Sequence, residues 1–155
     1  MLEKFCCAKK DETDFLCNDA LNQQKLRVNK TYLLFKKDDK LKILSYITLG
    51  VGAIEVSGER TLRGVRVKDK RLPRHIPCML IGKLATDKNE ENNHYASYLL
   101  SFATLQGLDK SEETPFPFIA LHAYPEAVSL YKRNGFEIAY HFQRKTKTIP
   151  MCSVN

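Results

Sequence analysis

The residue whose type and position most directly suggest chemistry is a tyrosine near the C-terminus. Tyr131 lies in the stretch SLYKRNGFE, four residues before the pair Gly135 and Phe136, where a helix is expected to end. A phenol placed there is a candidate proton donor, because its hydroxyl keeps its proton up to a pH of about 10. The alternative is a packed aromatic, since Ala127, Leu130 and Tyr131 would share one apolar helix face. The periodicity alone favours packing.

A second candidate is the polar loop KNEENN (residues 88–93), which separates an apolar strand from a helix. The first backbone N–H groups of a helix have no acceptor within it, and the helix dipole is positive at this end. Such an end is a ready site for a pyrophosphate. Asn92 and Asn93 tolerate positive φ, so they are candidates to shape the loop without glycine.

A third candidate is the basic segment GERTLRGVRVKDKRLPRHIP (residues 58–77), where the only acid after Glu59 is Asp69. We expect a surface loop or short helix there. Its cations are candidates to contact phosphates, and the alternative is a solvated connector. The cations are Arg60, Arg63, Arg66, Lys68, Lys70, Arg71 and Arg74.

The composition points to a soluble intracellular protein with an anionic partner. The formal net charge is +7, from 25 Lys and Arg against 18 Asp and Glu, which favours nucleic acid or a phosphorylated cofactor but also serves solubility. The five cysteines and four histidines show no metal spacing, so we expect reduced thiols in a cytoplasm and no metal. The N-terminal stretch lacks the apolar core of a secretory signal.

The elements that must position these residues follow from hydrophobic patterning. At 155 residues the chain has the length of one domain, residues 1–155. A helix is expected over 11–28, capped by Asp11 or Thr13, with four apolar residues facing inward. Strands at 31–37 and 41–56 are expected to form a hairpin. The inward-facing residues of the helix are Phe15, Leu16, Ala20 and Leu21.

The rest of the chain alternates strands and helices. Strands are expected at 78–87 and 116–123, with Gly82 as a bulge or a point of close approach. A helix over 94–108 would separate them, and its inward residues would be Leu99, Leu100 and Ala103. A second helix over 124–134 would have Pro125 in its first turn and Gly135 just past its end. Closing strands would cover 136–147 and 149–154, which gives a mixed α/β fold with helices on one central sheet.

Four stretches, in order along residues 5–153, resemble the GCN5-related N-acetyltransferase (GNAT) family. More narrowly, they are similar to the acetyltransferase toxins of bacterial type II toxin–antitoxin modules. DFLCNDALNQQKLRVNKTYLL resembles the first helix and strand of these toxins, and LSYITLGVGAIE resembles their hairpin strand. LPRHIPCMLIGKLATD resembles the approach to the fourth strand, and AVSLYKRNGFE resembles the closing helix.

The resemblance implies a GNAT-like mixed central sheet, splayed between strands four and five, with helices on both faces. It implies acetyl-CoA as co-substrate and Tyr131 as general acid to the leaving thiolate. A backbone N–H of the bulged fourth strand would stabilise the oxyanion. Leu84, Ala85 and Thr86 would line the pantetheine. The pyrophosphate would be held by Glu91, Asn92, Asn93, His94, Tyr95, Ala96 and Ser97.

The resemblance also implies partners. The acceptor would be the α-amine of an aminoacyl-tRNA, and its acetylation would stop translation. A ribbon-helix-helix antitoxin would neutralise the protein, and dimers are frequent in the family. The basic segment, together with Lys25, Arg27 and Lys30, would contact tRNA phosphates, so that binding would weaken with salt.

Two positions depart from the family pattern. The pyrophosphate loop has the form Q/R-x-x-G-x-G/A, and here Glu91 and His94 replace the first polar residue and the first glycine. Tyr124 stands where an asparagine is frequent, three residues before Ala127. Two alternatives therefore stay open. One is a non-catalytic GNAT-fold binding module, and the other is an acetyltransferase for a protein or small-molecule amine.

Overall fold

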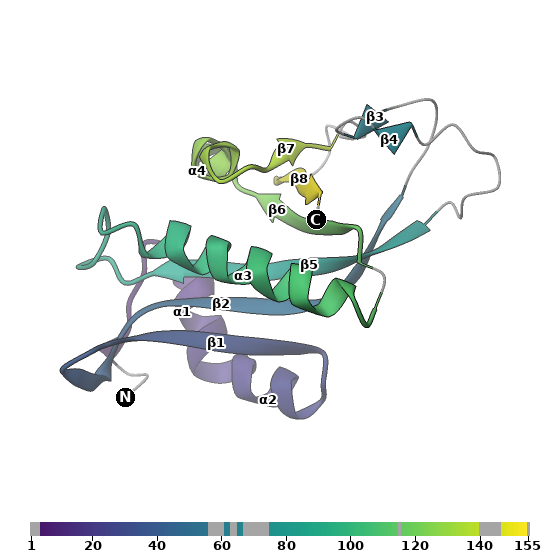
Figure 1. Cartoon of the computed structure of the whole chain (residues 1–155). Coiled ribbons are helices and arrows are strands. Elements are labelled where there is room, and N and C mark those ends of the chain that lie inside the picture. The colour runs from purple at the N-terminus through teal and green to yellow at the C-terminus, as the bar shows by residue number, and fades with distance from the viewer. Residues whose placement is uncertain are drawn as a thin grey trace. The chain divides into compact units, whose positions relative to one another are not determined.

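The computed structural model describes residues 4–55, 61–62, 65–66, 75–114, 116–139 and 147–154 (Figure 1). The chain divides into two compact units, which are described separately. The first comprises Met1–Gly50 and Ile81–Ala103, and the second comprises Val51–Leu80 and Thr104–Asn155. The expectation of a single domain stays a prediction.

The described elements form a six-stranded mixed sheet, flanked by helices, and a separate pair of short strands. The strand order in the large sheet is β1-β2-β5-β6-β8-β7, and β3 pairs with β4. In chain order the elements are α1 (Lys10–Asp14), the π-helix η2 (Phe15–Asp19), α2 (Ala20–Lys25), β1 (Asn29–Lys36), β2 (Asp39–Glu55), β3 (Thr61–Leu62), β4 (Val65–Arg66), β5 (His75–Thr86), α3 (Tyr95–Ser111), β6 (Phe118–Ala123), the 3-10 helix η3 (Pro125–Ala127), α4 (Val128–Arg133), β7 (Glu137–Ile138) and β8 (Ile149–Val154).

The N-terminal helix differs from the prediction in its cap and in one inward residue. It runs from Lys10 to Lys25 through a π-helical turn, and its first turn has no side-chain cap, so the proposed Asp11 or Thr13 cap is wrong. Thr13 instead accepts the backbone N–H of Cys7 at 3.1 Å. Phe15, Leu16 and Ala20 are buried as predicted, whereas Leu21 is 62% exposed. Leu21 follows Ala20 by about 100° around the helix, which takes it off the buried face.

The predicted hairpin of β1 and β2 is confirmed as an antiparallel pair. Its register shifts between Leu34, opposite Ser45, and Phe35, opposite Ile43, which leaves one extra residue in β2. Gly82 on β5 is a point of close approach, as predicted, since a Cβ there would lie 2.9 Å from Thr48 Oγ1.

The first unit has helices on both faces of its strands. Figure 1 shows α1 and α2 behind β1 and β2, and the first half of α3 in front of β5. Side chains alternate between the two faces of β1. The Tyr32 ring lies 4.9 Å from that of Phe102 in α3, whereas Leu33 packs against the core that contains Phe15 and Tyr46. The predicted inward residues of α3, which are Leu99, Leu100 and Ala103, are buried.

The second unit contains the closing strands and the last helix. β8 pairs antiparallel with both β6 and β7. The predicted helix over 124–134 divides into η3, which begins at Pro125, and α4. β7 covers Glu137–Ile138, and residues 140–146 of the predicted closing strand lie outside the described part.

The basic segment contains short strands rather than the expected loop or helix. β3 and β4 pair antiparallel, with Thr61 opposite Arg66 and Leu62 opposite Val65. β-branched residues occupy two of these four positions and favour extended backbone. Arg66 therefore lies in a strand. The other candidate cations, Arg60, Arg63, Lys68, Lys70, Arg71 and Arg74, lie outside the described residues.

Candidate active site

The predicted pantetheine strip lies at the C-terminal end of β5. Ala85 is buried, and Leu84 and Thr86 are half-buried. Ser45 of β2 donates its hydroxyl to the backbone carbonyl of Ala85 at 2.8 Å and lies 3.1 Å from Thr86 Oγ1. These bonds fix the end of β5, from which the candidate pyrophosphate loop departs.

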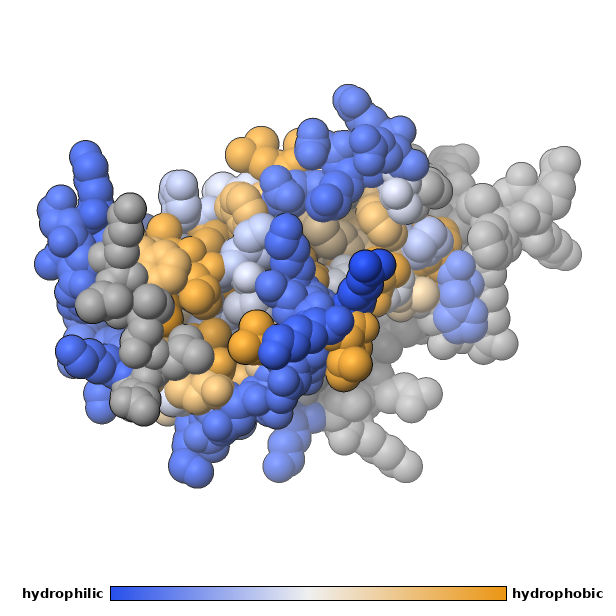
Figure 2. Space-filling model, turned by 90° about the horizontal axis from the view of Figure 1, so that it is seen from below, coloured by the Kyte–Doolittle hydropathy of each residue, from blue (hydrophilic) through white to orange (hydrophobic). Residues whose placement is uncertain are grey.

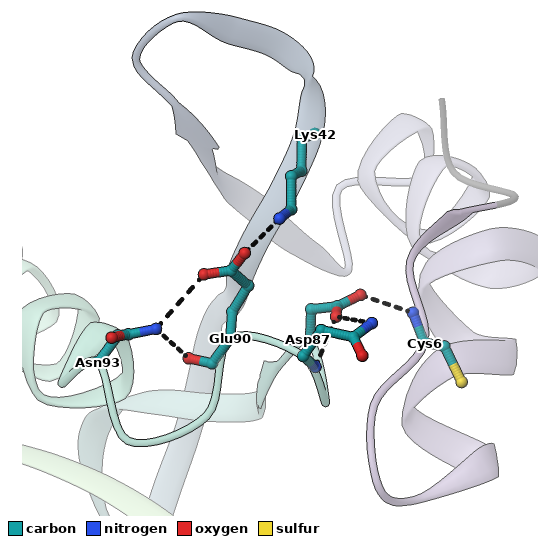
Figure 3. Close-up of polar contacts among 6 residues, drawn as sticks. Cys6, Lys42, Asp87, Glu90 and Asn93 are labelled. Atoms are coloured by element: carbon teal, nitrogen blue, oxygen red, sulfur yellow. Dashed lines mark hydrogen bonds and ion pairs between the residues drawn. The ribbon is translucent and has the colours of Figure 1, made fainter.

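The loop that follows β5 is attached to the N-terminal segment through Asp87 (Figure 3). The Asp87 side chain is buried, and its Oδ2 accepts the backbone N–H of Cys6 at 3.1 Å. Its Oδ1 accepts both the backbone N–H and the side-chain amide of Asn89, at 2.9 and 3.1 Å. Lys88 N–H donates to the Cys6 carbonyl at 2.8 Å, and Asp87 N–H donates to that of Leu44 at 2.9 Å. The start of the loop is therefore held on two sides.

A second contact holds the middle of the loop. The Glu90 carboxylate forms an ion pair with Lys42 of β2 (Figure 3). This hydrogen bond raises the pKa of Lys42, and the charges of Glu90, Asp87 and Asp39 act in the same direction, although desolvation opposes them. The Asn93 side-chain amide donates to the backbone carbonyl and the carboxylate of Glu90, at 3.2 and 3.4 Å. Lys42 thus compensates one of the loop's negative charges.

Two residues of the loop adopt the left-handed conformation that glycine usually supplies. Asn92 has φ of 66°, as predicted, and His94 has φ of 59°. The prediction for Asn93 is wrong, because Asn93 is not among the residues with positive φ. Its side chain donates to Glu90 instead. His94 occupies the position of the first glycine in the family pattern and adopts a glycine-like conformation. Asparagine and histidine are both enriched among non-glycine residues in this region.

The predicted pyrophosphate residues come together at the start of α3. Glu91, Asn92, Asn93 and His94 are exposed, and Tyr95, Ala96 and Ser97 are half-buried in the first helical turn. The His94 carbonyl accepts Tyr98 N–H at 3.0 Å, so the helical bonding begins there. The result is an exposed turn that leads into the positive end of a 17-residue helix, where an anion is stabilised.

A buried polar cluster on the α1 side of the strands was not predicted from the sequence. Glu12 is 8% exposed, and Tyr46 OH donates to its backbone carbonyl at 2.7 Å and lies 3.1 Å from its Oε2. Burial and the neighbouring Glu12 charge raise the pKa of Tyr46. Lys83 of β5 donates to Glu12 Oε1 at 3.3 Å. Lys83 is the one cation within the apolar run MLIGKLA. A lysine at such a position could have indicated from the sequence that an acidic residue lies opposite it in the fold.

In the second unit, Tyr131 is a packed residue within a helix-ending motif. It is 8% exposed, and its ring meets that of Phe136 edge-on at 6.0 Å. Phe136 N–H donates to the Tyr131 carbonyl and Gly135 N–H to that of Lys132, at 3.0 and 3.2 Å. Gly135 has φ of 86°. These are the two hydrogen bonds and the apolar contact of a Schellman motif. The spacing of Tyr131, Gly135 and Phe136 therefore has a structural cause, and the catalytic role of Tyr131 stays a prediction.

None of the five cysteines forms a disulfide in this structure. Burial raises the pKa of Cys78 and of Cys152, and the nearby Cys152 raises the pKa of Cys78 further. Within the described ranges, no helix is long and apolar enough to cross a membrane. The same residues contain no group of three or more His, Cys, Asp or Glu that is arranged to hold a metal ion.

The fold of this chain is similar to those of several solved structures. No protein-family model matches the sequence. A bacterial toxin of known structure is similar with a TM-score of 0.83 at 16% identity, over 99% of this chain and 82% of that chain. AtaTR bound with acetyl-CoA has a TM-score of 0.78 at 20% identity, over 97% of this chain and 85% of the other. AtaT complexed with acetyl-methionyl-tRNAfMet has a TM-score of 0.79 at 19% identity, with coverages of 97% and 86%.

These structures share the fold of this chain, and their low identities restrict the comparison to the fold. The mixed sheet with helices that the GNAT resemblance implies is thereby confirmed.

Proposed function

We propose that the chain is an acetyl-CoA dependent N-acetyltransferase whose acceptor is the α-amine of an aminoacyl-tRNA, so that it acts as a toxin by blocking translation. The observation that carries this proposal is the exposed turn at Asn92 and His94, which leads into the N-terminus of α3 with two residues in the left-handed conformation. It does so in a chain with the fold of AtaT, which has been solved with acetyl-CoA and with acetyl-methionyl-tRNAfMet.

The turn and the helix start supply what a pyrophosphate requires. Backbone N–H groups at the start of α3 would donate to its oxygens, and the helix dipole would favour its charge. Glu91 is exposed, so its carboxylate is screened by water and repels a bound phosphate only weakly. Glu90 is paired with Lys42. The backbone of Leu84, Ala85 and Thr86 would bind the pantetheine arm.

The chemistry is an acyl transfer. The neutral acceptor amine attacks the thioester carbonyl, the new C–N bond forms and the C–S bond breaks. The amine loses its proton to water, and the Tyr131 phenol donates its proton to the departing thiolate of coenzyme A. This transfer is slightly uphill, because a phenol has a pKa of about 10 and a thiol one of about 8.5, so it depends on a hydrogen bond that aligns the two groups. Water then returns the proton that the amine released to the Tyr131 phenolate. A backbone N–H of β5 would stabilise the oxyanion that forms at the carbonyl.

The partners follow the same proposal. Arg60, Arg63, Arg66, Lys68, Lys70, Arg71 and Arg74 would contact tRNA phosphates. A ribbon-helix-helix antitoxin would neutralise the protein, as AtaT has been solved with the C-terminus of the antitoxin AtaR. The site of action would be the cytoplasm, where aminoacyl-tRNA is present, and the assembly would be a homodimer.

A second candidate function is a non-catalytic binding module of the same fold. The observation that favours it is the acidity of the loop, in which Asp87, Glu90 and Glu91 outnumber the single cation Lys88. Such a module would keep the α3 turn as a structural element and would bind no acetyl-CoA.

Calorimetric titration with acetyl-CoA separates the two functions. We expect micromolar binding by the wild type and by Tyr131→Phe, because the substitution keeps the ring contact with Phe136 and leaves the loop unchanged. Coenzyme A without the acetyl group should bind similarly, and pantetheine much more weakly. A folded protein that binds no acetyl-CoA at millimolar concentration would contradict the enzyme and favour the binding module.

A further inference from the structure

The strand β1 forms one edge of the sheet, since β2 is its one neighbour in the strand order of the described residues. It is eight residues long, whereas about five or six are usual. Thr31 N–H points away from β2, since it donates to the Gln24 side chain of α2 at 3.0 Å and is thereby already satisfied. Backbone groups alternate in direction along a strand, so those of Leu33 and Phe35 face the same edge. An edge of this kind is a template for another extended segment.

The stretch from residue 20 to residue 37 is basic, although Asp39 of β2 lies opposite Lys36 in the register. Between residues 20 and 37 the sequence contains no Asp or Glu. The five cations in this range are all exposed, and they are Lys25, Arg27, Lys30, Lys36 and Lys37. Lys30 and Lys36 extend from the same face of β1, because they are an even number of residues apart. This charge repels a second copy of the same edge and attracts an acidic segment.

An exposed apolar patch continues the edge at the end of α2. Leu21, Leu26 and Val28 are 62%, 76% and 61% exposed. Figure 2 shows hydrophobic residues (orange) among hydrophilic ones (blue) on the face seen from below Figure 1, which is the side of α2. Scattered exposed leucines need no explanation, but Leu26 and Val28 are two exposed aliphatic residues directly before the start of β1.

The end of α2 has a non-glycine residue in the left-handed position where the end of α4 has a glycine. Val28 N–H donates to the Gln23 carbonyl and Arg27 N–H to that of Gln24, both at 3.0 Å, which is again a Schellman motif. Arg27 has φ of 59°, where α4 uses Gly135, and such a residue costs about 1–2 kcal/mol. The apolar contact of the motif is also missing, because Gln23 is polar where α4 has Tyr131. Strain of this kind concentrates at functional surfaces.

Two buried oxygens at the start of the same strand have unused hydrogen-bonding capacity. Asn29 Oδ1 and Thr31 Oγ1 have no hydrogen-bond partner among the described residues. The Asn29 amide donates to Gln23 Oε1 at 2.6 Å, so the polar side chains of α2 meet β1 at this point. Buried polar atoms without partners are rare in proteins.

The chemistry of the surface distinguishes a protein segment from RNA. Bases of single-stranded RNA stack on aromatic side chains. The aromatic residue of the exposed face, Tyr32, is already occupied by Phe102 on one side and by Lys30, whose Nζ lies 5.1 Å from the ring centroid. The exposed aliphatic side chains offer an apolar anchor instead, which suits a peptide.

We propose that β1 and the end of α2 form a docking surface for an extended acidic segment of another protein, which adds to the sheet as a strand next to β1. Alternate acidic side chains of the segment pair with Lys30 and Lys36, and its apolar side chains contact Leu26 and Val28. This surface is separate from the candidate pyrophosphate loop. The proposal assigns Lys25, Arg27 and Lys30 to a protein segment, whereas the family resemblance assigned them to tRNA phosphates.

The test uses a synthetic ten-residue peptide that alternates glutamate and valine. Titration of the full-length, isotope-labelled protein should shift the amide resonances of residues 31–36 and slow the hydrogen exchange of Leu33 and Phe35. The Lys30→Glu and Lys36→Glu double variant should weaken binding by about tenfold or more, because two attractions become repulsions. A peptide with N-methyl groups on one edge should also lose at least about tenfold, since it cannot complete the ladder.

Control variants test whether the peptide binds at the proposed surface. Leu26→Ser with Val28→Ser should weaken binding, whereas Leu105→Ser, at a leucine that is 64% exposed in α3, should leave it unchanged. Equal binding of the N-methylated peptide, or shifts confined to other residues, would overturn the proposal. It would also be overturned if a decauridylate bound residues 25–37 more tightly than the acidic peptide. Acetyl-CoA is absent from every arm, so the result is independent of the proposed enzyme activity.

Discussion

The carboxylate of Asp87 accepts the backbone N–H of Cys6 at 3.1 Å, across 81 residues of sequence. The neighbouring Lys88 N–H returns a bond to the Cys6 carbonyl at 2.8 Å. Together these bonds hold the start of the candidate pyrophosphate loop against the N-terminal segment. The loop is therefore arranged before any ligand binds, which reduces the entropy that binding would cost.

Removal of the Asp87 carboxylate should loosen this arrangement. Asp87→Ala leaves the Cys6 and Asn89 N–H groups without their acceptor, so we expect a loss of about 2–3 kcal/mol in the free energy of unfolding. Urea denaturation measures this loss, and calorimetry should show weaker acetyl-CoA binding in the variant that remains folded. Asp87→Asn is the matched control, because it keeps one acceptor oxygen and should lose less. Unchanged stability and affinity in the alanine variant would contradict the role of Asp87.

The conformation of His94 predicts a substitution that increases the stability of the protein. His94→Gly should raise stability by about 0.5–1 kcal/mol, because glycine adopts positive φ without strain. Asn93→Gly, one residue away, should instead destabilise the protein, since it removes both bonds to Glu90 and adds freedom to the unfolded chain. Thermal denaturation of the two variants measures the difference. Destabilisation of equal size in both would show that His94 is held by contacts and not by strain.

The hairpin, β5, α3 and the buried faces of the strands could be predicted from the sequence, because β-branched alternation and helical spacing are local signals. His94 was missed because φ is set by the whole turn, and the residue type alone does not reveal it. The cluster of Glu12, Tyr46 and Lys83 was missed for another reason, since 71 residues separate Glu12 from Lys83. Contacts between residues so far apart in the sequence form only because the folded sheet brings their side chains together.

The same cluster yields a prediction about a buried charge. Lys83→Met removes the cation that faces Glu12, whose side chain is 10% exposed, and should cost about 2–3 kcal/mol of stability. Adding Glu12→Gln should restore part of the loss, because no unpaired charge remains. Lys10→Met is the matched control, since Lys10 pairs with Asp14 on the surface at 3.2 Å and should change stability by less than about 1 kcal/mol. Equal costs for the two lysine variants would refute the importance of burial.

The buried thiols predict a pH dependence. Burial raises the pKa of Cys78 and Cys152 above its ordinary value of 9.0. Above that pH the unfolded chain loses thiol protons that the folded chain keeps, so the free energy of unfolding falls as pH rises. Between pH 8 and 9.5 we therefore expect a progressive decrease in the free energy of unfolding. Urea denaturation under reducing conditions should show this slope, and the slope should flatten in the Cys78→Ala and Cys152→Ala double variant. An unchanged slope in that variant would assign it to other groups.

The most direct test of the central claim is a single-turnover transfer of radiolabelled acetyl from acetyl-CoA to a set of purified aminoacyl-tRNAs, with wild-type protein and Tyr131→Phe at equal, saturating acetyl-CoA. We predict labelled aminoacyl-tRNA with the wild type, and a rate reduced by about 100-fold or more with Tyr131→Phe at unchanged acetyl-CoA affinity, because a general acid contributes about 10²–10⁴-fold. Equal rates in the two proteins would remove Tyr131 from the mechanism. No transfer to any aminoacyl-tRNA by a wild-type protein that binds acetyl-CoA would contradict the proposed acceptor.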